Sequence, residues 1–377
     1  MTSTQFLELA VSLSVQVALV IIVAHWLGRL VNCERMQCRL WTVCYVVLLS
    51  LVGVALLFPH PRLFQPWAAI DTQHATALVT IEMQLGQALF FVWLAGAAVS
   101  LMVFFIRSFQ VNRFLKTCQP VDLDKFISNE NQNDLPQMAS FPSKQRLRLI
   151  TSTRLTTPFC SQFHYPYIVV PEYLLGFDRQ KFNFIIRHEL EHLKTGHPLQ
   201  LFLQRVVEVV FWFHPMVWWA SQQSSISREF ACDEAAIDSP ADIAMYLRTL
   251  LTIMEYSASQ AEEAPTSLAF GRGKSIVALR ARRLTQIAKS NEFGGRSRIS
   301  GPAAYCSFVM LAALIGFLWL PMDVLASSRT NWSPWPTWSA SVLHDFDIPV
   351  RDFEVFDNRI ELHELSEHQT PESIDED

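Results

Sequence analysis

The chain has 377 residues, of which 50% are hydrophobic and only 17% are charged, and its mean hydropathy is positive at +0.20. This composition excludes an ordinary soluble domain of that length and favours a protein with several apolar segments. A net charge of -5 gives no reason to expect a nucleic-acid partner. The 7 cysteines are an odd number without a repeated CxxC spacing, which argues against a disulfide framework and a cysteine-only zinc site.

Four apolar segments are long enough to be candidates for crossing a lipid bilayer. At about 1.5 Å per helical residue, each covers most or all of the hydrocarbon core. They are Phe6 to Leu27, Leu40 to Phe58, Ala88 to Ile106 and Ala303 to Leu320. The first is longer than a signal-peptide core and has no basic residue before it, so we expect an uncleaved span. The sequence therefore predicts three transmembrane helices with short loops within 1–107 and a fourth within 301–325.

Positive charges indicate how these spans are oriented, because short loops rich in lysine and arginine stay in the cytoplasm. Three connections carry most of them: Arg29, Arg35, Arg39, Arg107, Arg113, Lys116, Arg280, Arg282, Arg283, Lys289, Arg296 and Arg298. We therefore expect a multi-pass protein of the bacterial inner membrane with an external N-terminus, a cytoplasmic segment over 108–300 and a short acidic extracytoplasmic tail over 326–377. The arginines from 280 to 283 are interpreted as topological anchors, with an exposed hinge as the alternative.

Short strands are predicted near the start of the cytoplasmic segment. Gln119 to Gln145 is polar and contains three prolines, which is typical of a linker or loop. Arg146 to Thr151 alternates polar and apolar residues before becoming apolar, and the later run YIVV is short and β-branched; both patterns favour strands. Prolines flank the second run, so we interpret it as an edge strand that could bind an extended substrate through its main chain, with core packing as the alternative. That strand comprises Tyr167, Ile168, Val169 and Val170.

The stretch RHELEHLKTGHP at 187–198 contains an HExxH pattern. Asp178 suits an N-cap, and the absence of glycine and proline from Gln180 to Thr195 predicts a helix that stops at Gly196 and Pro198. His188 and His192 are four residues apart, so both rings share one helix face and can reach one metal ion. Glu189 has the position of the residue that holds and deprotonates water in zinc hydrolases of this pattern. The alternative is a solvated helix end that matches the pattern by chance.

A catalytic zinc ion usually has three protein ligands, so a third is needed. His197 lies five residues after His192, one residue short of the metzincin spacing. A better candidate lies in SREFACDEAAID at 227–238, where Glu229 and Asp233 are four apart and share a helix face. Glu229 can complete a site of two histidines and one carboxylate, and Asp233 can accept the outward N–H of a ligand histidine. An ordinary exposed helix face is the alternative for both acids.

The segment Leu199 to Ala220 is apolar enough for a fifth span, yet it contains Arg205 and Glu208. A fifth crossing would also upset the alternation of the positively charged loops. We interpret the segment as a helix that lies in or dips into the bilayer beside the site, with a core helix of the cytoplasmic domain as the alternative.

Four stretches occur in order along the chain: TPFCSQFHYPYIVVP at 157–171, HELEH at 188–192, FWFHPMVWWA at 211–220 and REFACDEAAID at 228–238. Together they resemble the BlaR/MecR-type antirepressor metallopeptidases, over about residues 1–325. The resemblance implies a mainly α, polytopic membrane protein with about four transmembrane helices and a cytoplasmic, gluzincin-like HExxH zinc-metalloprotease domain that carries a small β-sheet. It implies one bound Zn²⁺ and assigns the site residues as follows: His188, His192 and Glu229 as zinc ligands, Glu189 as catalytic base, and Asp233 as the aspartate of the E-x-x-C-D element.

The resemblance also implies signal transduction, in which an extracytoplasmic event activates the protease to cleave a cytoplasmic protein, a DNA-binding repressor. β-Lactam receptors of this family carry a penicillin-binding sensor with an SxxK sequence, whereas the tail over 326–377 contains no lysine. We therefore do not expect acylation by an antibiotic. Trp332, Trp335 and Trp338 predict an aromatic belt at the membrane interface, with a site for an extracytoplasmic ligand or protein as the alternative.

Two other functions remain open at the level of the sequence. The first is a housekeeping membrane protease similar to HtpX or the CAAX-processing enzymes, which would cleave many membrane substrates. The second is a non-catalytic membrane sensor or scaffold, for which Glu189→Gln would have no phenotype. Membrane lipid is an expected partner of all three, and direct binding of nucleic acid is expected of none.

Overall fold

The structure, a computed structural model, describes residues 3–31, 33–58, 60, 72–121, 147–162, 165–262, 270–290 and 300–321. It is mainly helical with one small mixed sheet, as expected. The predicted aromatic belt at 332–338, the rest of the tail and residues 122–146 of the predicted linker lie outside the described residues.

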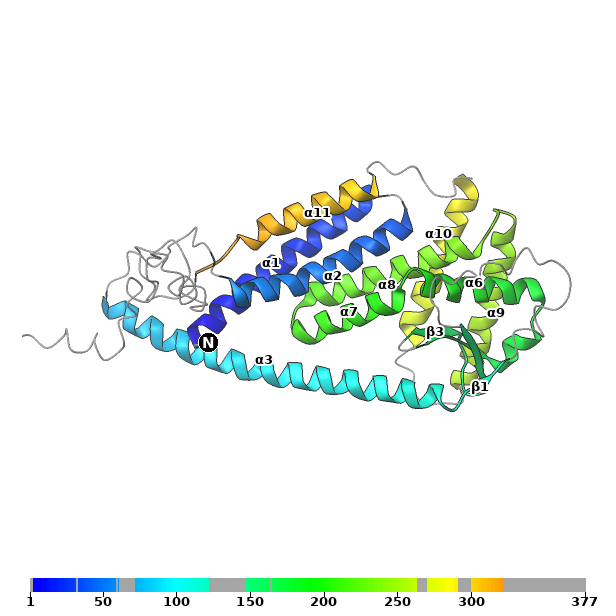
Figure 1. Ribbon diagram of the computed structural model, residues 1–377, viewed down its shortest axis with the longest axis horizontal. Helices are drawn as coiled ribbons and strands as arrows, with labels where there is room; N and C mark the ends of the chain where they lie inside the picture. Colours follow the sequence, from blue (N-terminus) through cyan, green and yellow to red (C-terminus); the bar gives the residue numbers. More distant parts are fainter. Residues whose placement is uncertain are drawn as a thin grey trace, which may run out of the picture.

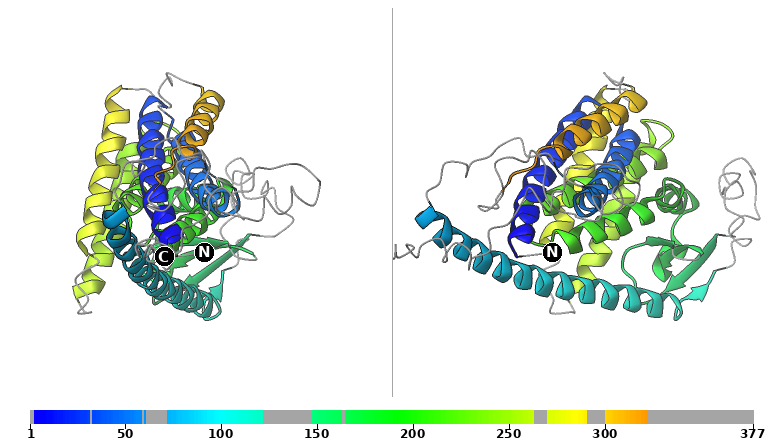
Figure 2. Two further views of the ribbon diagram at one scale, coloured as in Figure 1. Left: turned by 90° about the vertical axis from the view of Figure 1, so that its left-hand side faces the viewer. Right: turned by 60° about the vertical axis from the view of Figure 1, so that its left-hand side comes forward.

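Three helices are long and apolar enough to cross a membrane. They are α1 (Ser3–Leu30), α2 (Glu34–Leu57) and α3 (Thr72–Leu115). Each covers the corresponding predicted span, except that Phe58 caps the end of α2 instead of belonging to it. The helix α3 is much longer than predicted and runs from the candidate spans to the sheet (Figure 2).

The fourth predicted span is a shorter helix than expected. Helix α11 (Gly301–Gly316) has 16 residues and ends before the predicted boundary at Leu320. Polar side chains of α1 bind the backbone beyond it: Gln16 Nε2 donates to the carbonyl oxygens of Gly316 at 3.2 Å and Leu318 at 2.8 Å. Ser12 exchanges hydrogen bonds with the backbone of Leu320 at 3.2 and 3.0 Å. These contacts satisfy backbone groups that a continued helix would otherwise have paired.

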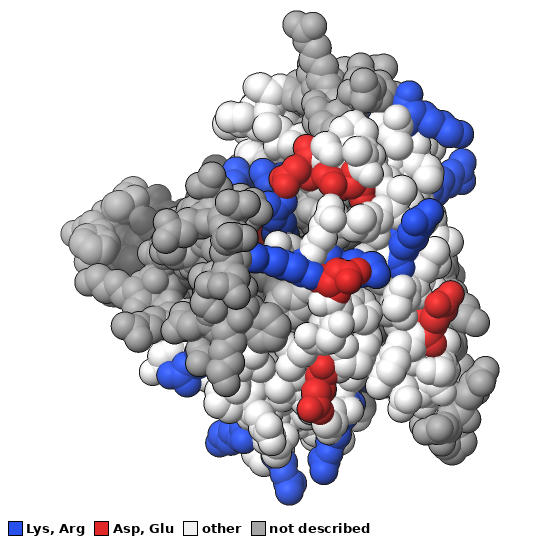
Figure 3. All heavy atoms as spheres, turned by 90° about the vertical axis from the view of Figure 1, so that its right-hand side faces the viewer, with Lys and Arg blue, Asp and Glu red and all other residues white. Residues whose placement is uncertain are grey.

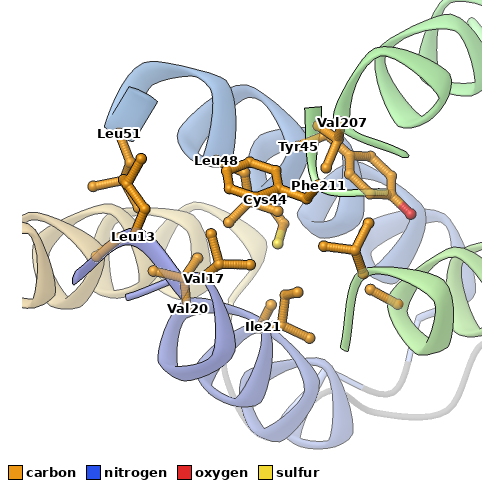
Figure 4. Close-up of a cluster of buried hydrophobic side chains, with 14 of the residues drawn as sticks. Leu13, Val17, Val20, Ile21, Cys44, Tyr45, Leu48, Leu51, Val207 and Phe211 are labelled. Atoms are coloured by element: carbon orange, nitrogen blue, oxygen red, sulfur yellow. The ribbon is translucent and has the colours of Figure 1, made fainter. Parts of the chain in front are cut away.

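The helices form two neighbouring groups (Figure 1). Helices α1, α2 and α11 lie side by side at one end, and α6, α9, α10 and the sheet lie at the other. Helices α7 and α8 connect the two groups. They share an apolar core with α1 and α2, in which side chains from these helices point toward one another (Figure 4). The labelled members of that core are Leu13, Val17, Val20, Ile21, Cys44, Tyr45, Leu48, Leu51, Val207 and Phe211.

The predicted single helix over 199–220 is wrong, because the chain forms two helices there. Helix α7 (His197–Val210) and helix α8 (Pro215–Ala236) are separated by a turn over 211–214. His214 has an extended conformation, which is favoured before a proline, and Pro215 begins α8, where its missing N–H is tolerated. The pair packs against the candidate spans while Leu199 and Phe202 remain exposed on its outer side.

The turn between α7 and α8 is held against α3 by two tryptophans. Trp93 Nε1 donates to the carbonyl oxygen of Val210 at 2.9 Å, and Trp212 Nε1 donates to that of Trp93 at 3.2 Å. The Trp212 indole packs directly against the α3 backbone here, because a Cβ atom on Gly96 would lie 2.1 Å from Trp212 Cε2. Glycine is therefore required at 96.

Replacing Gly96 by alanine is expected to destabilise the protein by about 1–3 kcal/mol, because the added methyl group must displace the Trp212 indole. Thermal unfolding of the purified protein in detergent measures the effect. Gly53→Ala is the matched control, since Gly53 also lies within an apolar helix and a Cβ atom there meets nothing within 4 Å. Equal melting temperatures for the two variants would contradict the close approach.

The sheet has the strand order β1-β2-β4-β3. Its strands are β1 (Gln119–Pro120), β2 (Arg148–Ser152), β3 (Phe159–Gln162) and β4 (Pro166–Pro171). Strands β2 and β4 are parallel, and the other two pairs are antiparallel. The predicted strands at 146–151 and 167–170 are therefore confirmed, while β1 within the predicted linker and β3 were missed.

The prediction that Tyr167, Ile168, Val169 and Val170 form an edge strand is wrong. They belong to β4, which lies between β2 and β3. The flanking prolines stand at its first and last residues, where a strand tolerates a missing donor. Ile168, Val169 and Val170 are all fully buried, as the side chains of a central strand covered on both faces should be. The described edge strand on this side is β3.

The sheet supports the helix that carries HExxH. After a 3₁₀ turn, η1 (Glu172–Gly176), helix α6 (Arg179–Lys194) begins beside Asp178 as predicted and packs its apolar side on the sheet. It ends at Lys194, with Thr195 as its C-cap; Gly196 follows with a left-handed φ of 72°, and Pro198 then lies in the first turn of α7. Helices α9 (Asp242–Glu262) and α10 (Phe270–Ser290) complete this end, where acidic and basic side chains are interspersed on the surface (Figure 3).

Candidate metal centre

Helices α6 and α8 pack together and bring three side chains to one point. His188 Nε2 and His192 Nε2 lie 3.2 Å apart on α6. Glu229 of α8 places Oε2 at 3.6 Å from the first nitrogen and Oε1 at 3.7 Å from the second. Ligand atoms bound to a tetrahedral zinc ion at about 2.0–2.1 Å lie roughly 3.3 Å from one another. The spacing of these three groups therefore fits a shared metal ion.

Cys232 is a competing third ligand. Its Sγ atom and ring nitrogens of His188 and His192 all lie within 4.8 Å of one another. The thiol is fully buried, and burial together with the negative charge of Glu229 raises its pKa well above the ordinary value. A thiol binds metal as the thiolate, which these surroundings disfavour. Glu229 is the better suited donor, since hydrogen bonding to His188 and the charge of Arg280 overcome burial and lower its pKa.

The outer nitrogen of His188 is held by two groups. Nδ1 lies 3.1 Å from Asp233 Oδ1 and 3.1 Å from the hydroxyl oxygen of Tyr246 on α9. Tyr246 itself donates to Asp233 Oδ1 at 2.6 Å. Because an ionised carboxylate only accepts, the Nδ1 atom of His188 must carry a proton, and Nε2 is the atom that faces Glu229 and His192. Asp233 thus occupies the place that the sequence predicted for it.

His192 has a different outer partner. Its Nδ1 atom lies 2.8 Å from Nδ1 of His197, the first residue of α7, and Cys232 Sγ lies 3.6 Å from the same atom of His197. His197 does not meet the metzincin spacing, but the left-handed turn at Gly196 folds it back onto the ring of His192. His197 therefore contacts the Nδ1 side of the His192 ring and lies away from Nε2, the atom that faces His188 and Glu229.

Electrostatics separate the two histidines. Burial alone would lower the pKa of His188, but its hydrogen bonds to Asp233 and Glu229 raise it to about 9. Burial and the neighbouring charge of His188 lower the pKa of His192 to about 3. Before a metal binds, the His188 ring is therefore positively charged near neutral pH, and the His192 ring is neutral.

Glu189 lies beside the metal-binding face of α6 and is buried. Burial raises its pKa to about 7, against the opposing charge of His188. Cys160 in β3 is close enough that the charges of Glu189 and Glu229, in addition to burial, raise its pKa. Strand β3 also contacts α6, the helix that carries Glu189. A carboxyl group whose pKa is near neutral can both accept and return a proton at working pH.

Arg280, interpreted from the sequence as a topological anchor or part of an exposed hinge, is not exposed. It lies on α10 with its side chain only 11% exposed, 3.1 Å from Glu229 Oε2 and 2.8 Å from Asp233 Oδ2. Arg283, one turn further on, pairs with Glu34 of α2 at 3.0 Å and with Glu234 at 3.4 Å. Arg280 and Arg283 therefore make contacts within the protein, and the exposed hinge is wrong for them.

The structure brings together all five predicted residues of the metal centre: His188, Glu189, His192, Glu229 and Asp233. The missed residues are Tyr246 and Arg280, which come from helices that show no local signal, and His197, which was set aside on spacing. A tight turn after the HExxH helix was a usable signal for His197, because Gly196 permits the reversal that returns the next residue to the site.

Apolar helices of membrane-spanning length, joined to a helix pair that gathers two histidines and a carboxylate, are typical of membrane metallopeptidases. The sequence profile described as BlaR1 peptidase M56 matches residues 4–277. The chain therefore belongs to the BlaR1 peptidase family, M56. It is also similar to the regulatory protein BlaR1 of Bacillus licheniformis, with 26% identity over 150 residues, which cover 40% of this chain and 24% of that relative.

Proposed function

We propose that this protein is a zinc endopeptidase of the inner membrane that cleaves a cytoplasmic protein in response to an extracytoplasmic signal. The observation that carries the proposal is the convergence of His188 Nε2, His192 Nε2 and Glu229 on one point. These three residues would hold one Zn²⁺. A zinc ion bound there would polarise the scissile carbonyl group and lower the pKa of water to near neutral.

Glu189 performs the proton transfers of this reaction. Its pKa of about 7 allows its carboxylate to take a proton from water and, as the acid, to pass that proton to the leaving amine. His188 is kept in the required tautomer by Asp233 and Tyr246, so it contributes a lone pair and takes no proton during turnover. In this mechanism Glu189 transfers the protons, His188 binds the ion, and Asp233 and Tyr246 fix the tautomer of His188.

Strand β3 is the proposed binding edge for the substrate. Within the described sheet it pairs only with β4, and it contacts α6, the helix that carries Glu189. An extended peptide that adds to this edge gains main-chain hydrogen bonds without a demand on its sequence. This assigns to β3 the role that the sequence suggested for residues 167–170.

The described contacts support a route from the membrane helices to the site. Arg35 at the start of α2 pairs through Nε with Glu191 Oε1 at 2.8 Å. Glu191 is the residue of the HELEH stretch that precedes His192 on α6. Glu34 pairs with Arg283 of α10, one turn from Arg280. A displacement of α2 would therefore act on α6, which carries the two histidines, and on α10, which carries Arg280. We orient the chain with 108–300 in the cytoplasm and 326–377 outside, because the arginine-rich connections are cytoplasmic.

The proposed substrate is a transcriptional repressor, which rests on the similarity to a regulatory protein and on membership of the family. Proteomics of cells that express the wild type or Glu189→Gln at equal abundance tests the proposal. One dominant cytoplasmic fragment from a DNA-binding protein, formed only with Glu189 intact, is the expected result. Fragments from many membrane proteins would instead support a housekeeping protease, and identical fragment sets would support a non-catalytic sensor.

Metal binding is expected to release at least about one proton between pH 7.5 and 8.5. His188 is protonated below its pKa of about 9 and must become neutral to bind the ion, whereas His192, with a pKa of about 3, is already neutral. The apparent affinity for Zn²⁺ should therefore fall at least about tenfold for each pH unit lowered in this range, and more where a zinc-bound water also ionises. Competition with a chelating dye at several pH values measures the slope, and a pH-independent affinity would contradict the protonated His188.

A further inference from the structure

Arg280 contacts two carboxylates of the metal centre with three different nitrogen atoms. Nε and Nη2 bind Oδ2 and Oδ1 of Asp233 at 2.8 and 2.5 Å. Nη1 lies 3.1 Å from Glu229 Oε2. Nη2 also donates to the Tyr246 hydroxyl oxygen at 3.3 Å. The guanidinium group is therefore in contact with a proposed zinc ligand and with both residues that hold His188.

The planar shape of the guanidinium group makes these contacts depend on one another. A two-pronged pair fixes the rotation of the Asp233 carboxylate, and its Oδ1 atom is the one that faces His188 Nδ1. The third nitrogen, Nη1, pairs with Glu229 Oε2. A lysine ammonium supplies a point charge but cannot reproduce this fork.

The charge of Arg280 is also required by its surroundings. Glu229 and Asp233 are two carboxylates one helix turn apart, and Glu189 adds a third nearby. The neighbouring arginine of α8, Arg228, makes its described hydrogen bonds to Gln204 and Ser224 instead. Among the described arginines and lysines, Arg280 is the one that forms ion pairs with both Glu229 and Asp233.

We propose that Arg280 is a positioning residue of the metal centre. It fixes the orientation of the Glu229 and Asp233 carboxylates and, through Asp233, the tautomer of His188. The proposal rests on the proposed function, since it assumes that these residues bind a metal ion. The proposal also assigns a role to α10. This helix contacts α8 and α9, and Arg280 reaches the metal centre only while α10 is packed against them.

The experiment compares Arg280→Gln and Arg280→Lys with Arg282→Gln in the full chain, purified in detergent. Arg282 is exposed on the same helix and is the matched control. Zn²⁺ affinity is measured by competition with a chelating dye, and ligand geometry by the visible absorption spectrum of bound Co²⁺. We expect Arg280→Gln to lose about 10–100-fold in affinity and to alter the Co²⁺ spectrum, as the loss of a group that orients ligands does. Arg280→Lys should recover part of the affinity and keep an altered spectrum.

Wild-type affinity and spectrum in both Arg280 variants would overturn the inference while leaving the proposed function intact. A wild type that binds no stoichiometric Zn²⁺ would instead overturn the proposed function. If Arg280→Gln fails to fold, Arg280→Lys decides alone: a spectrum identical to that of Arg282→Gln overturns the role of the fork, and a changed spectrum in a folded protein supports it.

Discussion

Replacing Glu189 by glutamine is expected to lower the rate of peptide hydrolysis by about 10²–10⁴-fold while Zn²⁺ binding is retained. Glutamine has nearly the same size, but it cannot take a proton from water or deliver one to the leaving amine. Its side chain lies beside the three proposed ligands and is not one of them. The site should therefore stay loaded and fail only in proton transfer.

Hydrolysis of a quenched-fluorescent peptide library by the purified protein, with cleavage products identified by mass spectrometry, measures this effect. Glu172→Gln is a suitable control, because Glu172 begins η1 and is exposed. Undiminished hydrolysis in the Glu189→Gln protein would remove Glu189 from the mechanism. Loss of bound zinc in the same variant would show that Glu189 is a ligand and not the base.

The second large effect is expected for Glu229→Gln, which should weaken Zn²⁺ binding by more than the roughly 10–100-fold that loss of an outer partner costs. Glu229 is the ionised donor that reaches both histidine nitrogens, and a neutral amide is a poor substitute. Cys232→Ser should change the affinity little, because the buried Cys232 remains a neutral thiol. Dye competition on the two variants separates the alternative ligand sets, and the reverse order of effects would assign the third ligand to Cys232.

The HExxH helix could be predicted to within about one residue, because local signals define both of its ends. Asp178 stands at the start, and Gly196 adopts the left-handed conformation that ends it. The i, i+4 spacing of the histidines then fixes their shared face without knowledge of the rest of the fold. The pair Glu229 and Asp233 followed from the same helical geometry, and the structure places them on α8 opposite α6.

Other features depend on long-range packing that spacing does not encode. Prolines beside the YIVV run suggested an edge strand, but strand order is decided by pairing with β2 and β3, which bind residues 167–169 of β4 from its two opposite edges. The break between α7 and α8 was signalled by Pro215, which the apolar pattern obscured. Arg280 lies far along the sequence from Asp233, and only the packing of α10 shows that it belongs to the site.

The central claim is that two histidines and Glu229 hold one zinc ion between α6 and α8. X-ray absorption spectroscopy of the zinc-loaded, purified protein tests it most directly, because the first coordination shell is measured without a substrate. We expect only nitrogen and oxygen atoms in the first shell of the zinc ion, at about 2.0–2.1 Å, with the signature of two imidazole rings. A sulfur neighbour at about 2.3 Å would contradict it and place Cys232 in the coordination shell.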